Sequence, residues 1–160
     1  MKTVIHTEPE HIADVISRCD ICFVGMSQSD GTPYVLPMNF GYSDGTVWLH
    51  SAFEGTHIDI LKSNPKVCIV FNTANRLVWQ HQDVACSYRM QAETVIGWGN
   101  VVFEEDYDTK VEALNVLMRH YTDKTFTYSK PSVVNTCIWR VRLERVSCRA
   151  FGVPHKQAAL

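Results

Sequence analysis

Two short segments of the chain carry residue types that could do chemistry at their observed spacing. The segment Cys19-Asp20-Ile21-Cys22 holds two thiols three residues apart, which is the spacing of zinc ligands and of thiol–disulfide exchange centres. The segment His50-Ser51-Ala52 places an imidazole and a hydroxyl at the end of an apolar run. An imidazole titrates near neutral pH, so His50 is a candidate for proton transfer.

The cysteine pair is interpreted as structural. A zinc site would need a second Cys pair or a paired His motif downstream, and the sequence has neither. A thioredoxin-like centre would need the pair to open a helix, whereas this pair follows one. Cys68, Cys137 and Cys148 lie in apolar stretches typical of buried thiols. We therefore expect no metal site, no disulfide framework, and packing as the favoured role of Cys19 and Cys22.

The His50-Ser51 segment does not indicate a hydrolase. No His and Asp residues stand around Ser51 in an order typical of a catalytic triad. From its position alone, at the end of a strand, His50 is interpreted as a surface or hydrogen-bonded structural histidine.

The composition sets the protein class. With 160 residues, 46% of them hydrophobic and 20% charged, the chain can form one domain with a core, expected to span residues 1–160. A net charge of −2 argues against nucleic-acid binding, which needs many basic residues. The apolar runs are too short to span a membrane, and no signal-peptide segment is visible. The expected location is cytoplasmic.

Two Asp-Gly turns are the strongest structural signal. Asp30-Gly31 and Asp44-Gly45 each separate two strand-like runs, which is typical of β-hairpins. The pattern predicts about six mostly antiparallel strands, at residues 21–27, 33–42, 47–51, 66–72, 94–104 and 136–150. Residues 66–72 are apolar enough to be buried on both faces, and Gly97 and Gly99 predict a β-bulge.

Helical spacing appears in three places. Thr7 and Glu10 form a capping box, so a helix is expected from there to about Cys19. A second helix is expected at residues 55–62. Asp106 is the expected N-cap of a third, whose core face is predicted to hold Val111, Leu114, Met118 and Tyr121.

These elements favour a mainly β, α+β fold. An antiparallel barrel, closed or partly closed, is expected because closure removes exposed strand edges. Three or four helices lie around it, residues 77–90 are irregular or an edge strand, and residues 156–160 are a loose tail.

One pair of segments resembles a known family. Residues 33–42 read Pro-Tyr-Val-Leu-Pro-Met-Asn-Phe-Gly-Tyr, and residues 47–57 read Val-Trp-Leu-His-Ser-Ala-Phe-Glu-Gly-Thr-His. Residues 64–68 and 94–99 continue the pattern. Over about residues 8–150 the chain resembles the pyridoxamine 5′-phosphate oxidase-like FMN-binding split-barrel proteins, and among them the nitroimidazole-resistance (Nim-type) branch.

The resemblance implies a six-stranded antiparallel split β-barrel that binds FMN, or FAD in its place, at the interface of a homodimer. It assigns cofactor binding to three segments. Among the side chains of these segments, His50 is the expected catalytic group because its imidazole titrates near neutral pH. The implied binding residues are Pro37, Met38, Asn39, Phe40, His50, Ser51, Ala52, Gly55, His57, Thr94, Val95 and Trp98.

Two departures from the family pattern bear on this site. Many relatives have Lys at His57, and Arg just before Thr94, where this chain has Glu93. The phosphate pocket is then less basic, and Arg89 or a larger flavin could compensate. The chain also lacks the Arg-Leu-x-Pro tail of true pyridoxamine phosphate oxidases, which argues against vitamin B6 oxidation.

The resemblance therefore implies an FMN-dependent oxidoreductase of the nitroimidazole-reductase type. Its expected partners are a second copy of the chain and small-molecule electron donors and acceptors, with no nucleic acid or membrane partner. No Gly-x-Gly-x-x-Gly motif identifies the electron donor. The alternative is a flavin- or haem-binding carrier or sensor without turnover.

Overall fold

The structure is a computed structural model that describes residues 2–153. The predicted tail at residues 156–160 lies outside this range. The elements are β1 Lys2–His6, α1 Pro9–Ser17, β2 Cys22–Ser27, β3 Pro33–Met38, β4 Gly41–Ser43, β5 Thr46–Ser51, α2 Thr56–Ser63, β6 Lys66–Asn72, β7 Arg76–Val78, the 3₁₀ turn η1 Ala85–Ser87, β8 Arg89–Glu104, α3 Tyr107–Tyr121, α4 Lys130–Val134, β9 Cys137–Arg142 and β10 Arg145–Val153.

All strand pairs in the described residues are antiparallel, and they form a split barrel. The main order is β3-β2-β6-β8-β9-β5-β4, while β10 pairs with β8 and β1, and β7 pairs with β8. The two ends of this order, β3 and β4, are consecutive in the chain, so the barrel is open between them. The predicted split-barrel fold is confirmed, and the structure divides it into ten strands.

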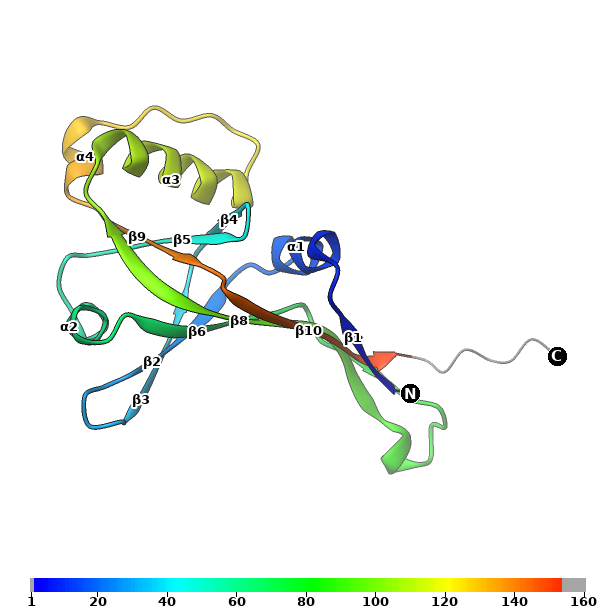
Figure 1. Ribbon diagram of the computed structural model, residues 1–160. Helices are drawn as coiled ribbons and strands as arrows, with labels where there is room; N and C mark the ends of the chain where they lie inside the picture. The colour runs from blue at the N-terminus through cyan, green and yellow to red at the C-terminus, as the bar shows by residue number, and fades with distance from the viewer. Residues whose placement is uncertain (1, 154–160) are drawn as a thin grey trace.

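The helices cover only part of the barrel (Figure 1). Helix α3 packs against β4 and β5, α1 against β8 and β6, and α2 against β2. Strand β7 and the start of β8 form an arm that extends away from α3 and α4. None of the helices within residues 2–153 has the length and apolar character that a membrane crossing requires.

The hairpin predictions are confirmed at both Asp-Gly pairs. Asp44 and Gly45 both have positive φ, 48° and 74°, in the turn between β4 and β5. Gly31 has φ 86° in the turn between β2 and β3, where the Asp30 carboxylate accepts a hydrogen bond from the Thr32 N–H at 2.9 Å. Only Gly and a few polar residues adopt this backbone region readily.

Two predicted strands are each divided in the structure. Residues 33–42 were expected as one strand, but the chain bends at Asn39 and Phe40 to give β3 and β4. Residues 136–150 bend at Leu143 and Glu144 to give β9 and β10. The second bend explains Gly99, since a Cβ there would lie 2.2 Å from the Arg142 carbonyl oxygen. The predicted bulge is wrong, because β8 keeps a continuous register through both glycines.

Two helix predictions also need correction. The capping box at Thr7 is wrong: the N-cap of α1 is Glu8, no side chain caps it, and Pro9 begins the helix. Asp106 does cap α3, since it accepts a hydrogen bond from the Thr109 N–H. The buried face of α3 is displaced from the predicted one and consists of Lys110, Ala113, Val116 and Leu117. This face is set by Gly41 on β4, where a Cβ would lie 2.7 Å from the Leu117 backbone nitrogen.

Candidate functional site

One face of the sheet is apolar and open to solvent. Strand β6 alternates between buried and half-exposed residues, so the prediction that both its faces are buried is wrong. Neighbouring strands place similar side chains beside it, because paired residues in a sheet point to the same side. We call this the outer face; its residues are Phe23, Val35, Pro37, Cys68, Val70, Ile96 and Trp98.

The outer face contrasts with the core face of the same strands. Val35 is 59% exposed and Phe23 is 40% exposed. Their neighbours Val24, Ile69 and Val95 are fully buried in the core. A sheet that leaves large apolar side chains in water on one face is typical of an interaction or ligand surface.

Strand β3 lies at the open edge of this sheet. Among the strands of residues 2–153 its only partner is β2, so within this range its other side has backbone groups without a strand partner. Pro33 and Pro37 have no N–H to donate, which suits them to an edge strand. Pro37 and Asn39 are exposed and Met38 is half-buried.

Phe40, at the bend after β3, offers little to a ligand. Its side chain is fully buried and lies edge-on to Phe71, with ring centroids 4.9 Å apart. Its N–H donates to the Tyr121 hydroxyl at 3.0 Å. Phe40 therefore fixes the bend from inside the core, and its carbonyl is the group left for a ligand.

The end of β5 carries the titratable group of the candidate site. His50 is exposed, yet the surrounding protein atoms lower its pKa by desolvation. The neutral ring therefore predominates at pH 7, and it can donate one hydrogen bond and accept another. The Ser51 hydroxyl donates to the Ala52 carbonyl at 2.8 Å.

Gly55 and His57 begin α2. Gly55 has φ 128°, a conformation that other residues rarely adopt, and no side chain caps the helix. The first N–H groups of α2 therefore point to an uncapped end with partial positive charge. His57 Nε2 is buried and has no hydrogen-bond partner. Burial also lowers the His57 pKa.

The three predicted residues of β8 lie in different surroundings. The Thr94 hydroxyl donates to Asn72 Oδ1 at 2.6 Å. Trp98 lies on the outer face, with the Arg145 guanidinium 4.0 Å above its ring. The Val95 side chain is fully buried in the core, and its strand pairs on both sides.

The predicted site residues form two groups in one chain. One group lies on β3 and β8, and the other, called the α2 group, lies at the start of α2 with Gly55 and His57. The sheet register puts Met38 and Val95 in one row, through Cys22 and Phe71. Helix α2 lies beside the opposite end, where β6 begins (Figure 1). The seven residues of β6, Lys66–Asn72, separate these ends by about 20 Å. The structure therefore does not bring Thr94 and the start of α2 together within one protomer.

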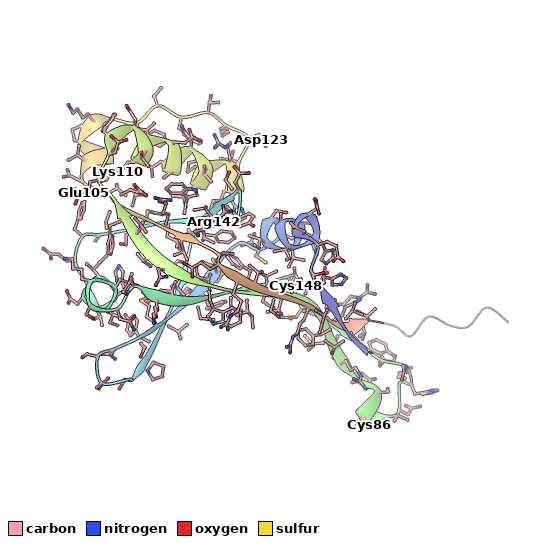
Figure 2. The ribbon with its side chains drawn as sticks, viewed as in Figure 1. Cys86, Glu105, Lys110, Asp123, Arg142 and Cys148 are labelled. Carbon is pink, nitrogen blue, oxygen red and sulfur yellow. The ribbon has the colours of Figure 1, made fainter. Side chains whose placement is uncertain are left out.

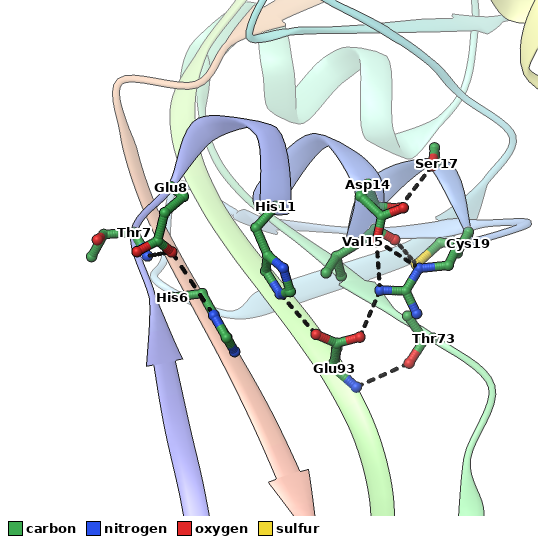
Figure 3. A network of polar contacts seen from close by, with 11 residues as sticks. His6, Thr7, Glu8, His11, Asp14, Val15, Ser17, Cys19, Thr73 and Glu93 are labelled. Atoms are coloured by element: carbon green, nitrogen blue, oxygen red, sulfur yellow. Dashed lines mark hydrogen bonds and ion pairs between the residues drawn. The ribbon is translucent and has the colours of Figure 1, made fainter. Parts of the chain in front are cut away.

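The structure also shows where Glu93 and Arg89 lie, the two residues that bear on the less basic phosphate pocket. Glu93 and Thr94 point to opposite faces of β8, since successive residues of a strand alternate. Glu93 faces α1, where it binds His11 and Arg18 (Figure 3). Arg89 is exposed at the start of β8, about 17 Å from Thr94 along the strand.

No sequence pattern indicated a role for Lys110, which lies near the start of α2. Lys110 is only 6% exposed, and its Nζ donates a hydrogen bond to the Thr136 carbonyl at 2.9 Å. It lines a cavity of about 400 Å³ with Phe53, Ile58 and Lys62. A lysine on an amphipathic helix is normally solvent-facing, so its burial appears only in the fold. Figure 2 shows Lys110 near Glu105, far from Cys86 on the β7–β8 arm.

Cys19 and Cys22 are buried free thiols. Burial raises the pKa of Cys19 to about 11 and that of Cys22 to about 12. A thiol with such a pKa is protonated at neutral pH and is a weak nucleophile. The geometry agrees with a packing role.

Comparison with known proteins places these features in context. A family model described as pyridoxamine 5′-phosphate oxidase matches residues 8–150. A candidate 5-nitroimidazole antibiotic resistance protein from Bacteroides thetaiotaomicron is 42% identical, with a TM-score of 0.85 over 93% of this chain and 87% of that chain. No curated protein matches the chain.

Two further solved structures share the fold at low identity. The flavocytochrome Anf3 from Azotobacter vinelandii is 17% identical, with a TM-score of 0.79 over 94% of this chain and 70% of that chain. The FAD and heme binding protein from Mycobacterium smegmatis is 15% identical, with a TM-score of 0.81 over 98% of this chain and 77% of that chain.

Proposed function

Because the chain belongs to the pyridoxamine 5′-phosphate oxidase-like family, we propose that it is a flavoprotein that binds FMN, with FAD as the alternative, between two copies of itself. The open edge of β3 beside an exposed apolar face is the observation that carries this proposal. A flavin ring is flat and apolar on its faces and has hydrogen-bonding groups along its edge. The backbone of residues 37–39 and the outer face match these two requirements.

The start of α2 fits the phosphate of the same cofactor. An uncapped helix N-terminus attracts anions through its free N–H groups and its dipole. His57 Nε2 is a buried polar atom without a partner, and leaving such an atom unpaired costs about 1–3 kcal/mol. Donation of the His57 Nε2–H to an oxygen of a bound phosphate, after a small rotation of the ring, would remove that cost. Gly55 leaves space here, since a Cβ would lie 3.2 Å from the His57 ring.

A homodimer accounts for the separation of the two groups. In a symmetric dimer that buries the outer faces, the β8 residues of one protomer approach the α2 group of its partner. The exposed apolar side chains Val35 and Phe23 would then leave water. Thr94 and Trp98 would complete a site that one chain leaves incomplete.

The proposed activity is oxidoreduction of the nitroimidazole-reductase type. The 42% identical relative is described by its role in 5-nitroimidazole resistance, which favours nitro compounds as electron acceptors. The bound flavin supplies the hydride and electron transfer. His50 is the proposed proton-transfer group: its neutral ring can donate an N–H hydrogen bond to a substrate oxygen, and after taking up a proton from water its imidazolium form can pass that proton to the reduced substrate.

Anaerobic stopped-flow mixing of reduced holoprotein with a 5-nitroimidazole tests this activity. The expected result is reoxidation of the flavin, slowed at least about tenfold by His50→Gln with flavin still bound. The matched control is His81→Gln, since His81 is exposed on the β7–β8 arm. If reduced holoprotein transfers no electrons to nitro compounds or quinones, the activity is absent. The alternative function, a flavin- or haem-binding carrier or sensor without turnover, is then favoured, because the chain shares its fold with FAD- and heme-binding proteins.

A further inference from the structure

Three side chains from separate parts of the chain converge beside α1 (Figure 3). They are His6 at the end of β1, His11 in α1 and Glu93 in β8. One potential ligand atom from each lies within 4.8 Å of the other two. His11 Nε2 is 2.8 Å from Glu93 Oε1, and the rings of His6 and His11 are stacked with centroids 3.9 Å apart.

We propose that His6, His11 and Glu93 form a binding site for a divalent transition-metal ion of the zinc or cobalt type. Two imidazole nitrogens and one carboxylate oxygen are a ligand set that such ions accept. Metal–ligand bonds of about 2.0–2.2 Å place two ligand atoms of a tetrahedral ion roughly 3.3–3.6 Å apart. The ion would therefore replace the 2.8 Å hydrogen bond between His11 and Glu93, which opens slightly, while His6 moves closer. Rotation of the partly exposed His6 ring provides this movement.

The surroundings hold the carboxylate ligand in place. Arg18 Nη2 binds Glu93 Oε2 at 2.6 Å, which leaves Oε1 facing His11. Arg18 also binds Asp14 at 3.0 Å, so its charge is shared between two carboxylates. The Glu93 backbone N–H donates to the Thr73 hydroxyl at 2.9 Å. Metal ligands are commonly oriented by such outer partners.

The local charge also favours a cation. Three carboxylates lie in this region: Glu93 binds His11, the Glu8 carboxylate lies 3.8 Å from His6 Nδ1, and Asp14 pairs with Arg18. Two guanidinium groups, Arg18 and Arg76, lie in the same region. The net charge of these five side chains is −1 before any ion binds. This net negative charge attracts a divalent cation to the site.

The site opens onto a cavity of about 460 Å³ that is lined by all three ligands and by Thr73, Gln91 and Phe151. Water can fill the remaining coordination positions from this side. None of the proposed flavin-binding residues lines the cavity, so the metal site stands or falls independently of the proposed function. The ion would tie β1 and α1 to β8.

Titration of the untagged full-length protein with Co²⁺ and Zn²⁺ tests the site. The expected result is one ion per chain, seen by equilibrium dialysis and as visible absorption bands of bound Co²⁺. His11→Gln and Glu93→Gln should each weaken binding at least about tenfold, since even outer partners have such effects. His81→Gln should leave the affinity unchanged. Absence of stoichiometric binding, or equal affinity in all variants, overturns the proposal.

A second measurement avoids dependence on the variants folding. In wild-type protein with labelled histidine rings, Zn²⁺ should shift the ring signals of His6 and His11 among the seven histidines. The proposal is wrong if these two signals stay fixed when Zn²⁺ is added.

Discussion

The Tyr121 hydroxyl binds the backbone N–H of Phe40 at 3.0 Å, although the two residues are 81 positions apart in the chain. The same hydroxyl donates to the Asp20 carbonyl at 2.8 Å. One phenol from the end of α3 thus joins the β3–β4 bend to the loop before β2. This bend is where the barrel is split and where the proposed flavin ring begins.

Tyr121→Phe should therefore weaken both the fold and the site. It removes the partner of the Phe40 N–H, which should lower the free energy of unfolding by about 1–3 kcal/mol. Flavin affinity should fall as the bend loosens. Urea unfolding and flavin titration measure the two effects, and Tyr107→Phe, at the exposed start of the same helix, is the control. Equal stability of the two variants would show that the hydroxyl does not hold the bend.

The hairpins and the barrel could be predicted because their causes are local. Asp44 and Gly45 carry the positive φ values that a tight hairpin needs, and strand alternation follows directly from the sequence. Residues 66–72 are predicted to be buried on both faces because an apolar sequence does not distinguish residues of the core from residues of an interface. Only the fold shows that Val70 and Cys68 face outward.

The candidate site could be predicted only in part. The resemblance of residues 33–42 and 47–57 to the family identified the candidate cofactor-binding residues. It did not indicate that Thr94 and the start of α2 lie at opposite ends of the sheet in one protomer. The bend at Phe40 had no local signal, since it depends on Tyr121, and neither had the meeting of His6 and His11 with Glu93. Such contacts depend on long-range packing, which propensity and periodicity do not report.

Val35→Arg should dissociate the proposed dimer. Val35 is 59% exposed on the outer face, and a charge there would have to be desolvated at the interface. We expect at least a tenfold weaker self-association, with a parallel loss of flavin affinity, in analytical ultracentrifugation across a concentration series. Val84→Arg, an exposed valine on the β7–β8 arm, should have no effect. A wild-type monomer with flavin fully bound would disprove the shared site.

His57→Ala should weaken flavin binding at least about tenfold, because it removes the ring whose Nε2 lacks a partner at the start of α2. The suitable control is His81→Ala, since His120 has a structural role: its Nε2 binds the Cys19 carbonyl at 2.7 Å and its ring lies against Phe40. Fluorescence titration of apoprotein gives both affinities. Equal affinities would remove His57 from the phosphate site.

Thiol labelling should be restricted to Cys86 in the native protein. Cys86 is the exposed cysteine, and the half-buried Cys68 lies on the outer face that the proposed dimer covers. Burial raises the pKa of Cys19 to about 11 and that of Cys22 to about 12. At pH 8 both buried groups are therefore neutral thiols and should react only after unfolding. Mass spectrometry after brief iodoacetamide treatment should find one modified site. Rapid modification of Cys19 or Cys22 would instead indicate a reactive pair.

Binding of flavin by the apoprotein is the decisive measurement for the proposed function. Apoprotein titrated with FMN and, separately, with FAD should quench the fluorescence of one flavin per chain, with two flavins in each dimer by sedimentation. The tighter of the two ligands identifies the cofactor, and the account predicts FMN. If folded apoprotein leaves the fluorescence of both flavins unchanged at micromolar concentration, the open edge of β3 is not a flavin site and the protein is not a flavoprotein.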